Sequence, residues 1–218
     1  MGNAVIFDMF GTLCSATSPE LRIIYEYNLN QDVHDGLQRA VCGTKFQEWK
    51  PYLGGIAKAA GIEADEKNRQ RIREIVHEQF EKGRRGVFPE ADGVLRVLKE
   101  RGFVLGLVSN AYPPSRRIVQ EGNLEQYFST VILSYEIGIT KQSPEIYHRC
   151  LKDLGIDAER AVMVGDSLKS DILASKRASD EKIGGILLSD KMPKEQVDKL
   201  IVVKKLSEVP EAVFEYFR

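Results

Sequence analysis

A small set of polar side chains in this sequence has the chemistry to bind a metal ion and a phosphate group together. The set consists of Asp8, Ser109 with Asn110, Lys141, and Asp166 with Ser167. Carboxylate oxygens bind a hard cation such as Mg²⁺, whereas an ammonium group and backbone N–H groups bind a dianion. If the fold brings these residues together, they form a site for a divalent cation beside an anionic ligand.

The elements that must position these residues are six short apolar runs, which predict β-strands. The runs are continuously apolar, which is typical of parallel strands covered on both faces. They are Ala4–Phe7, Phe103–Val108, Thr130–Leu133, Ala161–Val164, Gly185–Leu188 and Leu200–Val203. Asp8, Ser109 and Gly165-Asp166-Ser167 follow the first, second and fourth runs directly, and a short loop leads from the third to Lys141.

Helical patterns separate most of these runs. Residues 91–101 place an apolar stripe on one side and stop at Gly102, and Ser143-Pro144-Glu145 predicts another helix start with Ser143 as the N-cap. Alternation of strands and helices indicates an open, doubly wound α/β sheet. The carboxyl ends of parallel strands lie at one edge of the sheet, so the polar residues are expected to converge there.

The stretch from Cys14 to Gly86 interrupts this alternation. It contains helical patterns and no convincing strand, with helix starts at Ser18-Pro19-Glu20 and at Asp65-Glu66. We interpret it as a helical module inserted after the first strand, with Gly83–Gly86 as the return hinge. The expected division is a core of residues 1–14 and 87–218 and a helical cap of residues 15–86.

The ordered motifs resemble those of the haloacid dehalogenase superfamily. The resemblance covers nearly the whole chain, including the position of the helical insert, which is similar to the cap of that family's first subclass. The segments that carry it are Phe7-Asp8-Met9-Phe10-Gly11-Thr12-Leu13, then Val108-Ser109-Asn110, then Lys141 with Ser143-Pro144-Glu145, then Val164-Gly165-Asp166-Ser167 with Asp171. The resemblance implies a Rossmann-like doubly wound parallel sheet with an inserted α-helical cap, and a covalent aspartyl intermediate.

The same resemblance implies a role for each motif residue. Asp8 would be the nucleophile, and Lys141 would neutralise charge on both nucleophile and substrate. Mg²⁺ would be bound by Asp8, Asp166 and the backbone carbonyl of Phe10. Thr12, Ser109, Asn110 and Lys141 would bind the substrate, with Ser109 holding the transferred phosphoryl group. Ser167 and Asp171 would support the site, Asp171 by orienting a metal-bound water.

The main departure from the family pattern is Phe10. Phosphatases of this family carry an aspartate at that position, which serves as general acid and then as general base. A phenyl ring can neither donate a proton to the leaving group nor take one from water. Such catalysis contributes roughly 10² to 10⁴ in rate. Lesser departures are Gln142, where the family favours proline, and residues 176–181, which lack the usual glycine.

Three functions therefore stay open. The first is a Mg²⁺-dependent phosphoryl hydrolase that is slow or restricted to good leaving groups. The second is a metal-free 2-haloacid dehalogenase, in which Arg39 or Arg22 would bind the substrate carboxylate. The third is a non-catalytic relative that binds a ligand or a protein. The acids at Asp166 and Asp171 favour the first.

Composition excludes several other classes. The formal net charge of -1 gives no bulk attraction to nucleic acid or to anionic membranes, and no apolar run is long enough to span a bilayer. Cys14, Cys42 and Cys150 are too few and too widely spaced for a disulfide framework or a zinc site.

We expect a cytoplasmic protein whose partner is a small phosphorylated molecule. The oligomeric state and the substrate cannot be inferred from these patterns, although Tyr25, Tyr27, Trp49 and Tyr52 are candidates for lining the pocket.

Overall fold

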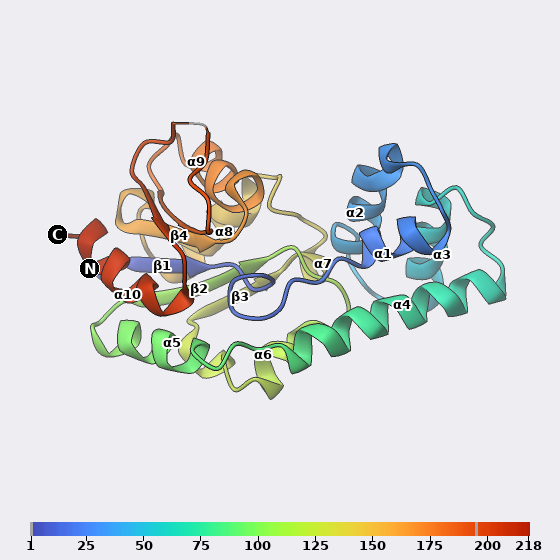
Figure 1. Ribbon diagram of the computed structural model, residues 1–218, viewed down its shortest axis with the longest axis horizontal. Coiled ribbons are helices and arrows are strands. Elements are labelled where there is room, and N and C mark those ends of the chain that lie inside the picture. Colours follow the sequence, from blue (N-terminus) through green and yellow to red (C-terminus); the bar gives the residue numbers. More distant parts are fainter. Residues whose placement is uncertain (1, 195) are drawn as a thin grey trace.

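The computed structural model describes residues 2–194 and 196–218, which form a six-stranded, fully parallel sheet flanked by helices (Figure 1). The order of the strands across the sheet is β3-β2-β1-β4-β5-β6. The strands are β1 (Ala4–Phe7), β2 (Val104–Ser109), β3 (Thr130–Leu133), β4 (Ala161–Gly165), β5 (Gly184–Leu188) and β6 (Leu200–Val203). Their bounds match the predicted runs to within one residue, and the predicted doubly wound α/β sheet is confirmed.

The central strands are buried because their side chains alternate between two apolar layers. In β1, Val5 and Phe7 belong to one core cluster, whereas Ala4 and Ile6 belong to the other, and all four are fully buried. Because both faces are covered, each strand needs apolar residues at every position, as the sequence pattern indicated.

Helices cover both faces of the sheet. α8 (Glu145–Leu154) and α9 (Leu173–Ala178) pack on the face of Ile6, and α5 (Ala91–Glu100), α6 (Arg116–Glu121) and α10 (Val209–Tyr216) lie on the other side (Figure 1). The shorter elements are α7 (Ser134–Ile137), 3₁₀ turns at Gln31–Val33, Glu125–Tyr127, Ala158–Arg160 and Leu206–Glu208, and a π-helical turn at Leu168–Ile172.

Four helices lie between β1 and α5 in the sequence. They are α1 (Pro19–Glu26), α2 (His34–Cys42), α3 (Trp49–Ala59) and α4 (Glu66–Arg85). α1, α2 and α3 gather beyond the carboxyl end of β1, and the long α4 leads back toward the sheet (Figure 1). The predicted helix starts are confirmed: Pro19 follows the N-cap Ser18, and the Asp65 carboxylate accepts a hydrogen bond of 2.7 Å from the Asn68 N–H.

The two chain segments that connect these helices to the sheet run side by side. The Ser15 N–H donates to the Gly86 carbonyl at 2.8 Å, and the Phe88 N–H donates to the Leu13 carbonyl at 3.0 Å. We propose this crossing as the boundary between a core of residues 1–14 and 87–218 and a cap of residues 15–86.

One local detail differs from the sequence prediction, and a second shows how the chain turns without the family's usual glycine. α8 begins at Glu145 with Pro144 in the N-cap position, and the Ser143 hydroxyl contacts the Glu145 carboxylate instead of capping a backbone N–H. After α9, Asp180 and Glu181 adopt φ angles of 50° and 64°, the left-handed conformation that glycine would adopt without strain.

No helix within the described ranges is long and apolar enough to cross a membrane.

Candidate active site

The polar residues named from the sequence converge at the carboxyl edge of the sheet. β1 lies between β2 and β4, so Asp8, Ser109 and Asp166 come from the ends of three adjacent strands. The strand order reverses direction at β1 and β4, and this switch point is where ligands bind in open α/β sheets. The predicted placement of these side chains at one edge is confirmed.

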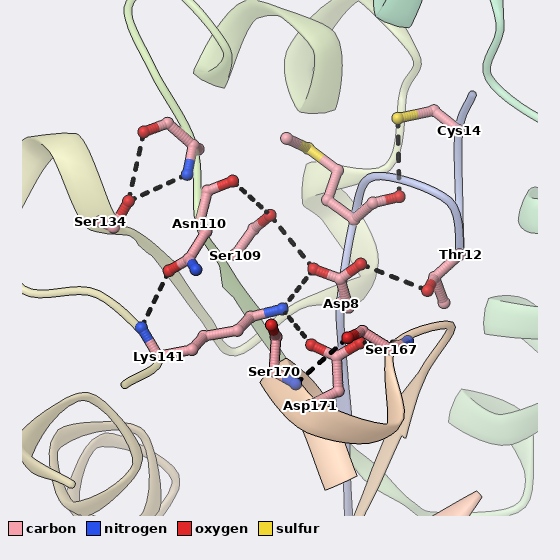
Figure 2. Close-up of polar contacts among 12 residues, drawn as sticks. Asp8, Thr12, Cys14, Ser109, Asn110, Ser134, Lys141, Ser167, Ser170 and Asp171 are labelled. Atoms are coloured by element: carbon pink, nitrogen blue, oxygen red, sulfur yellow. Dashed lines mark hydrogen bonds and ion pairs between the residues drawn. The ribbon is translucent and has the colours of Figure 1, made fainter. Parts of the chain in front are cut away.

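Lys141 lies between two carboxylates in the interior of the site (Figure 2). Its Nζ forms ion pairs with Asp8 Oδ1 and with Asp171 Oδ1, the latter at 2.7 Å, and Lys141 is only 3% exposed. Burial favours the neutral amine, but the charges of Asp171 and Asp8 outweigh it and raise the pKa of Lys141 above its ordinary value. Lys141 therefore lies between both acids as their shared ion-pair partner and holds them in place.

Two hydroxyl groups complete the surroundings of the Asp8 carboxylate. Ser109 Oγ donates to Asp8 Oδ1 at 3.2 Å, and Thr12 Oγ1 donates to Asp8 Oδ2 at 3.3 Å (Figure 2). Asp8 is 4% exposed, so these contacts and Lys141 replace the water that a free carboxylate would bind.

The backbone around Lys141 and Ser109 is held by side chains of the neighbouring loops. The Lys141 N–H donates to Asn110 Oδ1 at 2.8 Å, and the Ala111 N–H donates to Ser134 Oγ at 2.9 Å. Asn110 Nδ2 also donates to Gln142 Oε1 at 3.4 Å, so glutamine at the position where the family favours proline joins this network. The hydrogen-bonding groups of Asn110 are thus partly used to fix the loop of Lys141.

Asp8, Asp166 and Asp171 form an acidic cluster. One oxygen from each of the three carboxylates lies within 4.8 Å of the others. Loss of hydration and the charges of Asp8 and Asp171 raise the pKa of Asp166 to about 7. Burial raises the pKa of Asp171 to about 6, with the Lys141 charge opposing the effect. Three acids this close repel one another unless a cation or a proton lies among them.

The residues around this cluster fit a small divalent cation. Gly11 has a φ of +86°, and a Cβ built on it would lie 2.2 Å from Asp166 Oδ2. A Cβ on Gly165 would similarly lie 2.3 Å from Asp171 Oδ2. The chain therefore keeps side chains out of the space beside both carboxylates, and the donor set consists of the oxygen ligands that Mg²⁺ prefers.

Asp171 is more enclosed than its expected role implies. Besides its ion pair with Lys141, its Oδ2 accepts a hydrogen bond of 2.9 Å from the Ser167 N–H, and it is 1% exposed. Asp171 lies in the π-helical turn Leu168–Ile172, which directs its side chain toward Lys141. Ser167 Oγ caps this turn by accepting a hydrogen bond from the Ser170 N–H. Both oxygens are thus engaged within the protein.

Phe10 borders the site through its ring. The ring stacks on that of Tyr112, with centroids 5.5 Å apart and planes inclined by 5°. Tyr112 in turn donates its hydroxyl hydrogen to Thr17 Oγ1 at 2.8 Å. The Phe10 and Tyr112 rings therefore form an apolar wall of the cavity that contains Asp8.

A cavity of about 210 Å³ opens over Asp8 between the sheet edge and the inserted helices. Ala16–Glu20, Gln38 and Cys42 line it from the helical side, and Asn110, Tyr112, Ser167 and Ser170 line it from the other. The aromatic residues proposed for the pocket from the sequence do not line it. Tyr25 is 79% exposed, and Tyr52 is buried with its hydroxyl donating to the Val41 carbonyl. Trp49 and Tyr27 border separate surface grooves.

The two candidate cap arginines do not line the cavity either. Arg22 pairs with Glu26 at 3.2 Å and lies over the Tyr25 ring, and Arg39 is exposed. Sequence reasoning instead missed Glu20 and Tyr112 as lining residues. No motif signals them, because their position depends on how the inserted helices pack over the sheet edge.

Comparisons with known proteins connect this geometry to a family. Residues 3–179 match the model of a protein family described as "haloacid dehalogenase-like hydrolase". A phosphoserine phosphatase of Thermus thermophilus is 34% identical over 111 residues, which are 50% of this chain and 45% of that protein. A phosphoglycolate phosphatase of Aquifex aeolicus is 28% identical over 187 residues, or 80% of both chains. The fold is similar to that of a 2-haloacid dehalogenase from Pseudomonas syringae, with a TM-score of 0.66, 20% identity and coverage of 99% and 100%.

This chain spans less than half the length of the first curated relatives that it matches, including the Thermus thermophilus protein. The similarity to the solved dehalogenase is a similarity of fold. One fold therefore carries proteins named for two different reactions, and the choice between them depends on the residues of the site.

Proposed function

The chain belongs to the haloacid dehalogenase-like hydrolases, and from that premise we propose that it is a Mg²⁺-dependent phosphoryl hydrolase. Its substrate would be a small phosphorylated metabolite. Asp8 Oδ attacks phosphorus, and the bond from phosphorus to the leaving oxygen breaks with its electron pair. Water then cleaves the aspartyl-phosphate and releases inorganic phosphate.

The arrangement around Asp8 carries this proposal. A carboxylate that attacks a phosphate dianion meets like-charge repulsion, which a close ammonium group and a metal ion relieve. Lys141 is held against Asp8 with almost no exposure, and Asp166 brings a second carboxylate to the same edge. Displacement of a halide by Asp8 needs no metal, so in a haloacid dehalogenase this acid could serve only to activate the water that cleaves the aspartyl ester.

Asp8, Asp166 and the backbone carbonyl of Phe10 would hold Mg²⁺. When bound, Mg²⁺ supplies positive charge that offsets the negative charge of the phosphoryl oxygens. Asp171 then acts through Lys141, which it orients by the 2.7 Å ion pair. Lys141 and Ser109 hold the phosphoryl group, and Thr12 and Asn110 keep Asp8 and the lysine loop in position.

Phe10 limits the substrates that turn over quickly. Without an acid at this position, an alkoxide leaving group receives no proton, and water receives no base for the second step. Acyl and aryl phosphates release weakly basic groups and avoid the first of these problems, so we expect them to react fastest.

The dehalogenase alternative loses support from the composition of the cavity. A 2-haloacid needs a cation for its carboxylate, and of the described residues that line the cavity only Lys141 is cationic, already paired with Asp8 and Asp171. The non-catalytic alternative predicts binding without turnover of any of these compounds.

A panel of substrates separates the three hypotheses. Acetyl phosphate, p-nitrophenyl phosphate, alkyl phosphates and 2-haloacids would be assayed with Mg²⁺ and with EDTA, using Asp8→Asn as the control. We expect phosphate release from the first two that requires both Mg²⁺ and Asp8. Halide release in EDTA would favour the dehalogenase, and inertness toward the whole panel would favour a binding protein.

A further inference from the structure

Glu20 is a buried carboxylate at the wall of the cavity, and one of its two oxygens has no hydrogen-bond partner in the described part of the chain. It is the second residue of α1, it is 7% exposed, and it lines the same cavity as Asp8 and Asn110. Within the described part of the chain, no group hydrogen-bonds to its Oε2. Buried polar atoms are nearly always paired, so an unpaired carboxylate oxygen at a cavity wall indicates a missing donor.

The two tyrosines near Glu20 do not supply this donor. Tyr52 and Tyr112 lie near enough to interact electrostatically with Glu20. The Tyr52 hydroxyl donates to the Val41 carbonyl at 2.7 Å, and the Tyr112 hydroxyl donates to Thr17 Oγ1 at 2.8 Å. Each phenol has one hydrogen and has already used it.

His34 is the basic group that interacts with Glu20, and it is also engaged. Its ring Nδ1 lies 3.4 Å from Asp35 Oδ1. Burial raises the pKa of Glu20, and a backbone hydrogen bond at Glu20 and the His34 charge oppose this. Neither the tyrosines nor His34 hydrogen-bonds to Oε2, and a ligand in the cavity that Glu20 lines can supply the donor.

The charges of the cavity define what can bind there. Its described lining contains four acids, Asp8, Glu20, Asp166 and Asp171, and Lys141 as its cation. Lys141 is committed to Asp8 and Asp171. A substrate carboxylate near Glu20 would find no positive partner and would face a like charge in a desolvated site.

We propose that Glu20 accepts a hydrogen bond from an ammonium or hydroxyl group on the organic part of the substrate. The enzyme would then select phosphate esters of small amino alcohols or polyols and reject phosphorylated carboxylic acids. This inference rests on the proposed phosphoryl transfer to Asp8. A cavity of about 210 Å³ suits a phosphate with a few further heavy atoms.

The test compares substrates that differ at the end remote from phosphorus. Phosphoethanolamine and glycerol 1-phosphate provide the donors, and phosphoglycolate places a carboxylate there. We expect kcat/KM with Mg²⁺ to favour the better of the two donor substrates over phosphoglycolate by about 10²-fold or more, since a site built to bind a donor rejects analogues that lack it. The relative rates of the two donor substrates distinguish ammonium from hydroxyl.

Glu20→Gln keeps the shape of the side chain and removes its charge. In this variant the preference for the donor substrate over phosphoglycolate should fall by about tenfold or more. Glu26→Gln is the matched control, because Glu26 lies on the same helix and pairs with Arg22 and Arg71 at the surface. The control should keep the wild-type preference.

Two results would overturn the inference. One is a wild-type protein that prefers phosphoglycolate or does not discriminate, which is decisive even if Glu20→Gln fails to fold. The other is an unchanged preference in folded Glu20→Gln. If Mg²⁺-dependent acetyl phosphate hydrolysis persists in either case, the proposed function stands and only the role of Glu20 is lost.

If the alkyl phosphates turn over too slowly to be compared, binding still tests Glu20, and the proposed function fails only if acetyl phosphate and p-nitrophenyl phosphate are inert as well. Calorimetric titration of Asp8→Asn with phosphoethanolamine, glycerol 1-phosphate and phosphoglycolate in Mg²⁺ would give the affinities directly. Tighter binding of a donor compound, weakened by adding Glu20→Gln, would support the inference, and equal affinities would contradict it.

Discussion

Replacing Lys141 by methionine is expected to be the most destabilising single change in the site. Methionine keeps much of the apolar stem and removes the ammonium group that pairs with Asp8 and Asp171. The two carboxylates are 4% and 1% exposed, so water cannot replace the lost partner. Removing one member of a buried ion pair costs about 3–5 kcal/mol.

This cost converts to a large thermal shift. In a chain of 218 residues, a loss of 1 kcal/mol lowers Tm by about 2–4 °C, so Lys141→Met should lower it by about 6–20 °C. Urea unfolding in EDTA at pH 8 would measure the loss of free energy independently.

The free energy of unfolding lost in Lys141→Met should become smaller toward pH 5. There the carboxylates left without Lys141 take up protons, so the native variant binds more protons than its unfolded chain. The free energy of unfolding of the variant then falls as the pH rises, more steeply than that of the wild type.

Lys182→Met is the matched control. Its Nζ pairs with Glu159 at 2.9 Å, but both side chains are more than half exposed. This change should leave the unfolding midpoint nearly unaltered. A loss below about 1 kcal/mol for Lys141→Met, or equal losses for the two variants, would refute the view that Lys141 holds two buried charges together.

Three further predictions concern the metal and Phe10. Mg²⁺ should raise Tm more at pH 8 than at pH 6, because the pKa of about 7 at Asp166 leaves a proton competing with the metal at the lower pH, and equal shifts in thermal unfolding would contradict this. Gly11→Ala should abolish the Mg²⁺-induced rise in Tm by crowding Asp166. Gly61→Ala, whose φ is +68° with no atom within 4 Å of the added Cβ, should keep that rise and lose only about 1 kcal/mol of stability in urea unfolding. Phe10→Asp should raise steady-state hydrolysis of acetyl phosphate by about 10²-fold by supplying a base for water, whereas Phe10→Leu should not, and equal rates for both variants would show that the missing base does not limit turnover.

The sheet and its polar edge could be predicted from local sequence. Runs such as Ala4–Phe7 are apolar at every position because both faces are covered, and this pattern does not depend on distant residues. Parallel strands place their carboxyl ends together, so the meeting of Asp8, Ser109 and Asp166 followed from the strand assignment alone.

The partners of individual side chains could not be predicted in this way. Asp171 is bound to Lys141 and to the Ser167 N–H because a π-helical turn rotates it inward, and no residue type signals that turn. Glu20 lies in an ordinary helix start, and its Oε2 has no partner although Tyr52 and Tyr112, which donate elsewhere, lie near it. Such facts arise from tertiary packing.

Rapid mixing of the protein with p-nitrophenyl phosphate and Mg²⁺ tests the central claim most directly. Attack by Asp8 on this good leaving group should outpace hydrolysis of the aspartyl-phosphate, since Phe10 supplies no base for water. We predict a burst of one nitrophenolate per chain, followed by slow turnover, with a phosphoryl group on the Asp8 peptide in mass spectra of quenched samples and none in Asp8→Asn. Phosphate release without a burst and without modification of Asp8 would contradict the account.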